Sequence, residues 1–117
     1  MRLTEITYGS ALAIESYGPG FFRVGTHVLR GSSLVTPWDA GPWGGLDDLA
    51  TPLAMAGKID VLLLGLGAEV AIVPRAWREA LEAAGIGVEP MNTPAACRTY
   101  NVLLGEGRRI AAALIPV

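Results

Sequence analysis

This sequence contains only one cysteine and one histidine, so it is poor in the thiol and imidazole groups that most often act as nucleophile or base near neutral pH. Cys97 precedes Tyr100 by three residues and Leu104 by seven, which is the spacing of a helix stripe that faces a core. A reactive thiolate needs a base or a cation beside it, and Arg98 points to a different face of the same helix. We therefore interpret Cys97 as a buried structural residue and predict no catalytic role for it.

The sequence contains the residue types of a Ser-His-Asp triad but not the motif that usually surrounds one. His27 is followed by Ser32 and Ser33 and later by Asp39, but the sequence has no G-x-S-x-G nucleophile elbow and no helix directly after the serines. One histidine and one cysteine also fall short of a metal-ligand cluster. We expect no enzyme activity, no metal site and no cofactor.

A G-L-G turn at 65–67 follows the most apolar run of the chain. A dinucleotide fingerprint reads G-x-G-x-x-G between a strand and a helix, so that backbone amides approach a pyrophosphate. Here Gly65 and Gly67 match, but Val70 replaces the third glycine and the next helix begins only near Pro74. Two interpretations remain open: a tight turn, or a small-ligand crevice formed with the helix that begins near Thr93.

Trp38 and Trp43 lie in a stretch rich in glycine and proline, residues 37–45, where we expect no regular structure. Loop tryptophans either pin the loop onto the core or anchor a partner protein, because large rigid aromatics dominate interface energies. Two interpretations of Arg108 and Arg109 also remain open: both are strand-end charges in water, or one of them forms an ion pair with a nearby acid.

The second half of the chain, from residue 59, reads as strand, helix, strand, helix, strand. The run 59–65 is too apolar and too short for anything but a buried strand. Helices are predicted over 75–84 and 93–104, with strands over 86–91 and 108–115. Since strand–helix–strand crossovers place parallel strands in one sheet, these strands should form one largely parallel sheet.

Turn and cap residues divide the rest of the chain. Residues 11–16, 21–24, 27–30 and 33–36 read as an antiparallel β meander, with hairpin spacing at Gly25. A helix is predicted over 47–56, capped by Thr51 with Pro52 at its first position. Thr93 is the predicted cap of the last helix, and Ala76 and Leu81 belong to the predicted apolar stripe of the helix over 75–84.

Composition limits the class of protein. The 117 residues are 51% hydrophobic and 17% charged, below the charged share of about 25% that is typical, so an apolar surface, a protein partner or a homodimer is expected. A net charge of −2 without a basic stripe argues against nucleic-acid binding. No apolar run reaches the roughly 20 residues of a membrane span, and no signal peptide is visible. We predict one cytoplasmic domain over 1–117.

Several motifs together resemble a known family of small domains that includes mitochondrial respiratory complex I assembly factor 3 and the adipogenesis-associated domain protein. The likeness covers nearly the whole chain, and the pattern G-I-x-x-E-x-M-x-T followed by T-Y-N-x-L-x-x-E-G-R is its most specific part. The main motifs are YGPGFFRV at 17–24, GIGVEPMNT at 85–93, ACRTYNVL at 96–103 and EGRRIAAAL at 106–114.

The resemblance implies a three-layer α/β domain with a mixed central sheet and no established enzymatic activity. Some relatives help to assemble a membrane respiratory complex by binding partner proteins. This chain departs from the family at Leu66, where relatives often carry a small polar residue. We predict a non-catalytic binding domain, an assembly factor for membrane respiratory complexes. The alternative is a small-molecule-binding domain or weak enzyme that uses the Gly65–Gly67 crevice. Candidate binding residues are Trp38, Trp43, Gly65, Gly67, Thr93 and Arg108.

Overall fold

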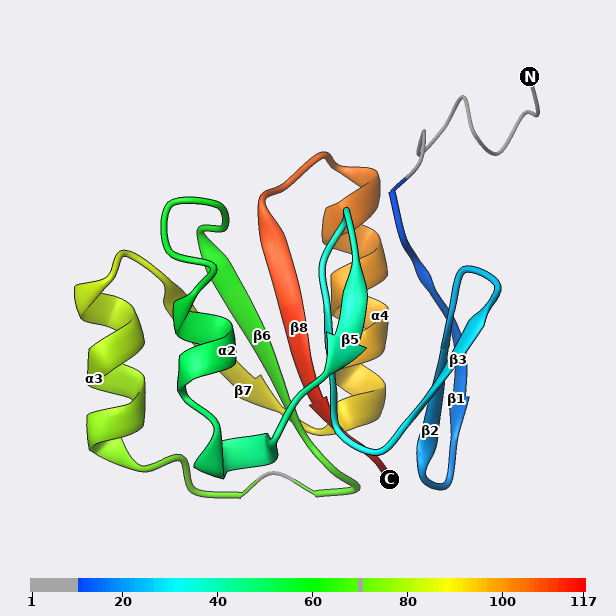
Figure 1. The fold of residues 1–117 in the computed structure, drawn as a ribbon, viewed down its shortest axis with the longest axis horizontal. Helices are drawn as coiled ribbons and strands as arrows, with labels where there is room; N and C mark the ends of the chain where they lie inside the picture. Colours follow the sequence, from blue (N-terminus) through cyan, green and yellow to red (C-terminus); the bar gives the residue numbers. More distant parts are fainter. Residues whose placement is uncertain (1–10, 70) are drawn as a thin grey trace.

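The computed structural model describes residues 11–69 and 71–117, so the predicted absence of a signal peptide at the start of the chain lies outside the described residues. Strands and helices alternate as the sequence predicts in the second half of the chain (Figure 1). In chain order the elements are β1 Ile14–Gly18, β2 Phe21–Val24, β3 His27–Arg30, β4 Ser33–Val35, β5 Ala40–Pro42, the 3-10 turn η1 Gly45–Asp47, α2 Ala50–Leu53, β6 Val61–Leu66, α3 Arg75–Ala83, β7 Gly87–Met91, α4 Thr93–Gly105 and β8 Ile110–Ile115.

A mixed five-stranded sheet forms the centre of the fold, in the order β5-β4-β8-β6-β7. Strand β6 runs parallel to both β7 and β8, as the strand–helix–strand pattern predicts. The other side of the sheet is antiparallel, because β4 pairs with β8 and β5 pairs with β4. The predicted α/β class and mixed central sheet are confirmed.

Each face of this sheet buries its own hydrophobic core, because side chains alternate along its strands. Leu63 and Ala112 face α4 and the strands β1 and β2. Leu62 and Ala113 face the opposite way, toward α3 and the segment that contains α2. The small alanines of β8 let both layers approach the sheet closely, so the fold has three layers.

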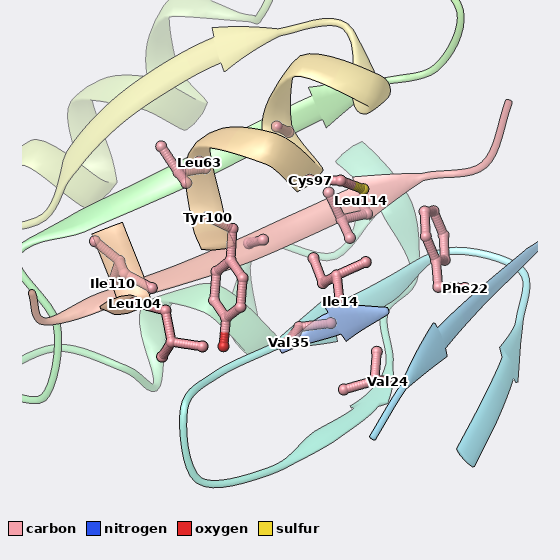
Figure 2. Close-up of a cluster of buried hydrophobic side chains, with 12 residues drawn as sticks. Ile14, Phe22, Val24, Val35, Leu63, Cys97, Tyr100, Leu104, Ile110 and Leu114 are labelled. Carbon is pink, nitrogen blue, oxygen red and sulfur yellow. The ribbon is translucent and has the colours of Figure 1, made fainter. Parts of the chain in front are cut away.

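A separate antiparallel sheet, β1-β2-β3, covers the core beside α4, on the far side of the molecule from α3 (Figure 1). Ile14, Phe22 and Val24 point from it toward the core (Figure 2). Helix α4 also holds the chain at β1 by hydrogen bonds. The Tyr100 hydroxyl donates to the Leu12 carbonyl oxygen at 2.7 Å, and the Asn101 side-chain amide exchanges two bonds of 2.9 Å with the backbone of Ile14.

Two strand predictions need correction. The segment 33–36 was predicted to continue the meander, but β4 leaves that sheet and pairs with β8, where Leu34 and Val35 bury their side chains on opposite faces. Residues 37–45 were predicted to lack regular structure, yet they contain β5. A tight turn, in which the Thr36 amide donates to the Asp39 carbonyl oxygen at 2.8 Å, folds this segment back onto β4.

Helix starts also differ from prediction. Instead of one helix, the segment 47–56 contains only the short α2, and η1 ends at its first residue. Thr51 is not the cap: it lies within α2, and its amide and hydroxyl donate to the Asp48 carboxylate. The α4 cap is Asn92, whose side chain accepts from the Ala95 amide. In α3, the sequence predicts that Ala76 is part of the buried stripe, but Ala76 is exposed. The next residue, Trp77, is buried instead.

Candidate functional site

Gly65, Gly67 and Thr93 come together where β6 ends and α4 begins, as predicted. The Thr93 hydroxyl donates to the Ile115 carbonyl oxygen at 2.6 Å and accepts from the Gly67 amide at 2.8 Å. The Thr93 amide donates to the Gly67 carbonyl oxygen, also at 2.8 Å. These three bonds tie the end of β6, the start of α4 and the end of β8 into one unit, which we call the Thr93 clasp.

The Thr93 clasp fills the space that the crevice interpretation needs. A Cβ atom on Gly65 would lie 2.9 Å from the Thr93 hydroxyl oxygen and 3.1 Å from its Cα atom, so the glycine permits this close packing. Thr93 is fully buried. Gly67 adopts a φ of +90°, a conformation that favours glycine. The geometry supports the interpretation of G-L-G as a tight turn.

The α4 N-terminus has no free amide with which to hold an anion. The amides of Thr93 and Ala95 donate to the Gly67 carbonyl and the Asn92 side chain. The Ala96 amide donates to the Asn92 carbonyl oxygen, and Pro94 has no N–H. A phosphate binds at a helix start through such donors, and here the protein has already engaged them.

Of the side chains considered as nucleophiles, Cys97 is buried and Ser33 is hydrogen-bonded. Cys97 is 3% exposed, and its burial raises the pKa of its thiol from 9.0 to about 11, although the positive charge of Arg98 acts in the opposite direction. Ser33 donates to the Gly31 carbonyl oxygen, and the Asp39 carboxylate accepts from Thr36. His27 is exposed on β3. In the part of the chain that the structure describes, no three His, Cys, Asp or Glu side chains gather as a metal site.

Trp43 lies in the core and pins its loop there. It is 4% exposed, and its indole Nε1 donates to the Asp48 carbonyl oxygen at 2.8 Å. Its ring packs against Trp77 with 6.4 Å between ring centroids and a tilt of 59°. Trp43 is therefore a packing residue at this position rather than an exposed anchor.

Trp38, in contrast, is 48% exposed at the turn between β4 and β5. The turn is fixed by the buried Thr36, whose hydroxyl oxygen accepts from the amides of Trp38 and Asp39 at 3.3 and 2.9 Å. The same hydroxyl donates to Asp39. The fold thus holds a large indole partly in water on a turn whose backbone is fixed.

An open cleft of about 210 Å³ lies on the same β4–β5 hairpin, between β5 and the α2 segment. Its walls are mainly apolar. Sequence reasoning missed it because it depends on β5, and the run Ala-Gly-Pro gives no strand signal. The lining residues are Leu34, Asp39, Ala40, Gly41, Pro42, Thr51 and Met55.

Arg108 lies far along the sheet from the Thr93 clasp. It is exposed in the connection that leads into β8, whereas Gly65 lies at the opposite end of the neighbouring parallel strand. Its neighbour Arg109 forms the ion pair that the sequence left open, with 3.1 Å between Nη2 and the Asp60 carboxylate. A role of Arg108 in binding stays a prediction. The predicted site residues therefore occupy separate parts of the molecule rather than one site.

Comparison with known proteins decides the family. The family described as "Protein of unknown function (DUF498/DUF598)" matches residues 14–115. The chain belongs to this family. A family member from Rhodobacter capsulatus, described as uncharacterized, is 51% identical over 117 residues, which are 100% of this chain and 94% of that protein.

The family includes proteins named NADH dehydrogenase [ubiquinone] 1 alpha subcomplex assembly factor 3. The zebrafish protein is 36% identical over 88% of this chain, which spans 63% of its length. The human protein is 33% identical over 99% of this chain and 67% of its own length. These relatives confirm the resemblance to assembly factor 3 that the sequence motifs indicate.

Solved structures of similar proteins share the fold. A Bartonella henselae protein described as an outer membrane protein matches with a TM-score of 0.83 and 35% identity, over 92% of this chain and 97% of that one. The Rpa2829 protein of Rhodopseudomonas palustris matches with a TM-score of 0.77 and 39% identity, over 90% of this chain and 83% of that one. A Bordetella pertussis protein described as a Mth938-like domain matches with a TM-score of 0.76 and 27% identity, over 90% of this chain and 85% of that one.

Proposed function

We propose that this chain is a non-catalytic protein-binding domain that helps to assemble a membrane respiratory complex, and that the β4–β5 hairpin is its contact surface. The observation that carries the proposal is the half-exposed indole of Trp38 on a turn that Thr36 fixes. Exposed indole surface is costly in water and strongly favourable once a partner covers it. Since the turn is already ordered, binding loses little backbone entropy there.

The adjoining cleft supports the same surface. Its mainly apolar walls suit one apolar side chain of a partner, and Asp39 at its rim suits a polar contact. A partner that covers Trp38 and inserts a side chain beside Met55 would contact both parts of the hairpin. The two features together resemble an interface in which a buried anchor is paired with a pocket.

The names of the relatives support a respiratory complex as the class of partner. Assembly factor 3 proteins are named for a step in building a respiratory NADH dehydrogenase, and they align with nearly the whole of this chain. The buried thiol of Cys97, with its raised pKa, and the hydrogen-bonded hydroxyl of Ser33 fit a role without catalysis. A cytoplasmic location, with contact to the complex at the membrane surface, belongs to the same proposal. No helix of the described residues is long and apolar enough to cross a membrane.

The alternative functions gain less support. A small-molecule site at Gly65 and Gly67 would need the space that the Thr93 side chain fills. A homodimer stays a prediction, and light scattering would reveal it. If two copies pair through the β4–β5 hairpin, the Trp38→Ala variant should be monomeric at concentrations where the wild type is dimeric.

The test of the proposed function is complementation. Cells that lack the protein receive the wild type or Trp38→Ala, and native electrophoresis of their membranes measures the assembled NADH dehydrogenase complex. Loss of an anchor tryptophan typically weakens binding by about 2 kcal/mol or more, a factor of about 30. We expect the variant to accumulate much less assembled complex than the wild type at equal protein level.

Val102→Ala is the matched control, because Val102 is also exposed, 59%, but lies on α4. Thermal unfolding of both variants separates a binding defect from a folding defect. The proposal fails if cells without the protein assemble the complex normally, or if folded Trp38→Ala restores it as well as the wild type does.

A further inference from the structure

The outer face of the sheet β1-β2-β3 carries a group of arginine and apolar side chains with no assigned role. Strand register places Arg30 opposite Phe21 and Val28 opposite Arg23. Residues opposite each other in an antiparallel pair lie on one face, and so do residues two apart. Phe22 and Val24 alternate with this set and are buried in the core. Phe21, Arg23, Val28 and Arg30 therefore share the face that points away from the core, and we call it the arginine face.

The arginine face is open to solvent. Arg23 and Arg30 are exposed, and Val28 is 52% exposed. Phe21 is half-buried, in part because its ring lies over Gly18, where an added Cβ would come within 2.5 Å of it. The face thus presents a flat aromatic ring and a valine between two guanidinium groups.

The charge of this face is unbalanced within the described residues. Glu15 is the one acid within β1, β2 and β3, and it lies at a β-bulge. Neither Arg23 nor Arg30 forms an ion pair with a described residue. The ion pairs between described residues involve Arg78 and Arg109, which lie elsewhere in the fold. The first 57 residues contain three basic residues, and the two that the structure describes both lie on this face.

The spacing of the two arginines fits acids on an extended chain. They occupy diagonal positions on neighbouring strands, which places such side chains about 7–8 Å apart. Carboxylates two residues apart on an extended strand lie on one side, at about 6.8 Å. Guanidinium groups bind carboxylates by paired hydrogen bonds, and an apolar side chain two residues further along would reach Phe21 or Val28.

Phosphate polymers and lipid surfaces fit this face less well. Recognition of an anionic membrane typically uses about four to eight basic residues, and DNA binding uses about six to ten phosphate contacts. The arginine face offers two, on a chain with a net charge of −2. A short acidic segment needs no more than two.

We infer that the arginine face binds an extended acidic segment of a partner protein, of the pattern acid-x-acid-x-apolar. The inference rests on the proposed function, because it gives the protein-binding domain a second contact and states its chemistry. It would let the domain hold one component at the β4–β5 hairpin and an acidic segment at the arginine face.

The experiment is an NMR titration of the full chain, labelled with nitrogen-15. The probe is an acetylated peptide with two glutamates one serine apart, followed by serine and leucine. We expect amide shifts within β1, β2 and β3 and weaker binding at higher salt. The double variant Arg23→Gln/Arg30→Gln should bind about tenfold more weakly, because it loses two solvent-exposed ion pairs that each contribute modestly.

Arg75→Gln/Arg98→Gln is the matched control, because both of these arginines are exposed and the change in net charge is the same. It should bind like the wild type. The inference is overturned if both double variants bind equally weakly, if a lysine version of the peptide binds as well, or if the shifts map elsewhere. Binding to phosphatidylglycerol vesicles that needs Arg23 and Arg30 while the peptide does not bind would also overturn it, in favour of lipid.

Failure of the two proposals can be told apart. If the peptide does not bind but Trp38→Ala still blocks assembly, only the arginine face is wrong. If Trp38→Ala assembles the complex normally while the peptide binds at Arg23 and Arg30, the hairpin proposal is wrong.

Discussion

At the scale of single residues, glycine is required at position 65 because another element touches it. Strand interiors normally lose stability with glycine, and a small residue there marks a close approach. In this fold the approach is that of Thr93, whose hydroxyl joins β6 to β8. The clasp therefore depends on the absence of one methyl group.

We predict that Gly65→Ala destabilises the protein by about 1–3 kcal/mol, because the new methyl group would meet Thr93 and Leu114 at 3.0 Å or less. Urea unfolding followed by tryptophan fluorescence would measure the change. Gly41→Ala is the control, since a Cβ there meets nothing within 4 Å. Equal stability of the two variants would contradict the clasp.

Cys97 gives the protein a pH dependence of stability at alkaline pH. Its thiol has a pKa near 9.0 when exposed and about 11 in the fold. The folded state thus keeps its proton where the unfolded state loses it, so the contribution of Cys97 is intact below pH 9 and disappears as pH rises through 11. Tyr100, whose pKa burial also raises, adds to the loss at higher pH.

We predict that Cys97→Ala loses less stability than the wild type between pH 8.5 and 10.5, with a difference on the order of 1 kcal/mol. Urea unfolding at a series of pH values measures this slope. The neutral-pH stability of Cys97→Ala supplies the baseline, because the substitution also removes packing. Parallel slopes in the two proteins would show that the thiol titrates normally.

At the scale of elements, Asn101 acts as a substitute for a neighbouring strand. Its amide exchanges two hydrogen bonds with Ile14, as the next strand of a sheet would. The outward backbone groups of β1 are thereby bonded to α4 at this point, and the sheet edge is blocked there. The small sheet is attached to the rest of the fold by this contact and by the packing of Phe22 and Val24.

We predict that Asn101→Ala destabilises the fold by about 1–3 kcal/mol, because it leaves a buried N–H and a carbonyl at Ile14 without partners. Amide hydrogen exchange should rise most strongly in β1. Val102→Ala, one residue along the same helix, should change neither quantity. Unchanged exchange in β1 would mean that packing alone holds the small sheet.

At the scale of the whole molecule, the sequence predicts the second half of the fold better than the first. The run 61–64 is apolar throughout, and Pro74 and Gly85 mark the two ends of the helix between two strands, so local signals agree with the final structure. Strand β5 has no such signal. Its pairing with β4 creates it, and that depends on the turn at Thr36.

The same limit applies to the candidate site. Trp38 and Trp43 share one loop and one composition, so nothing local separates them. Their difference comes from Trp77, distant in sequence, which packs against Trp43 and leaves Trp38 outside. The arginine face likewise appears only once strand register is known, because Arg23 and Arg30 lie on different strands.

Strand order also has a consequence for biosynthesis. Strand β8 leaves the ribosome after every other strand of the five-stranded sheet, yet it occupies the middle, with β4 on one flank and β6 on the other. Until β8 emerges, β4 and β6 both lack the strand that pairs with them, and their apolar side chains on this side stay uncovered. The sheet can therefore be completed only after β8 has left the ribosome, and chaperones have the greatest opportunity to bind before that point.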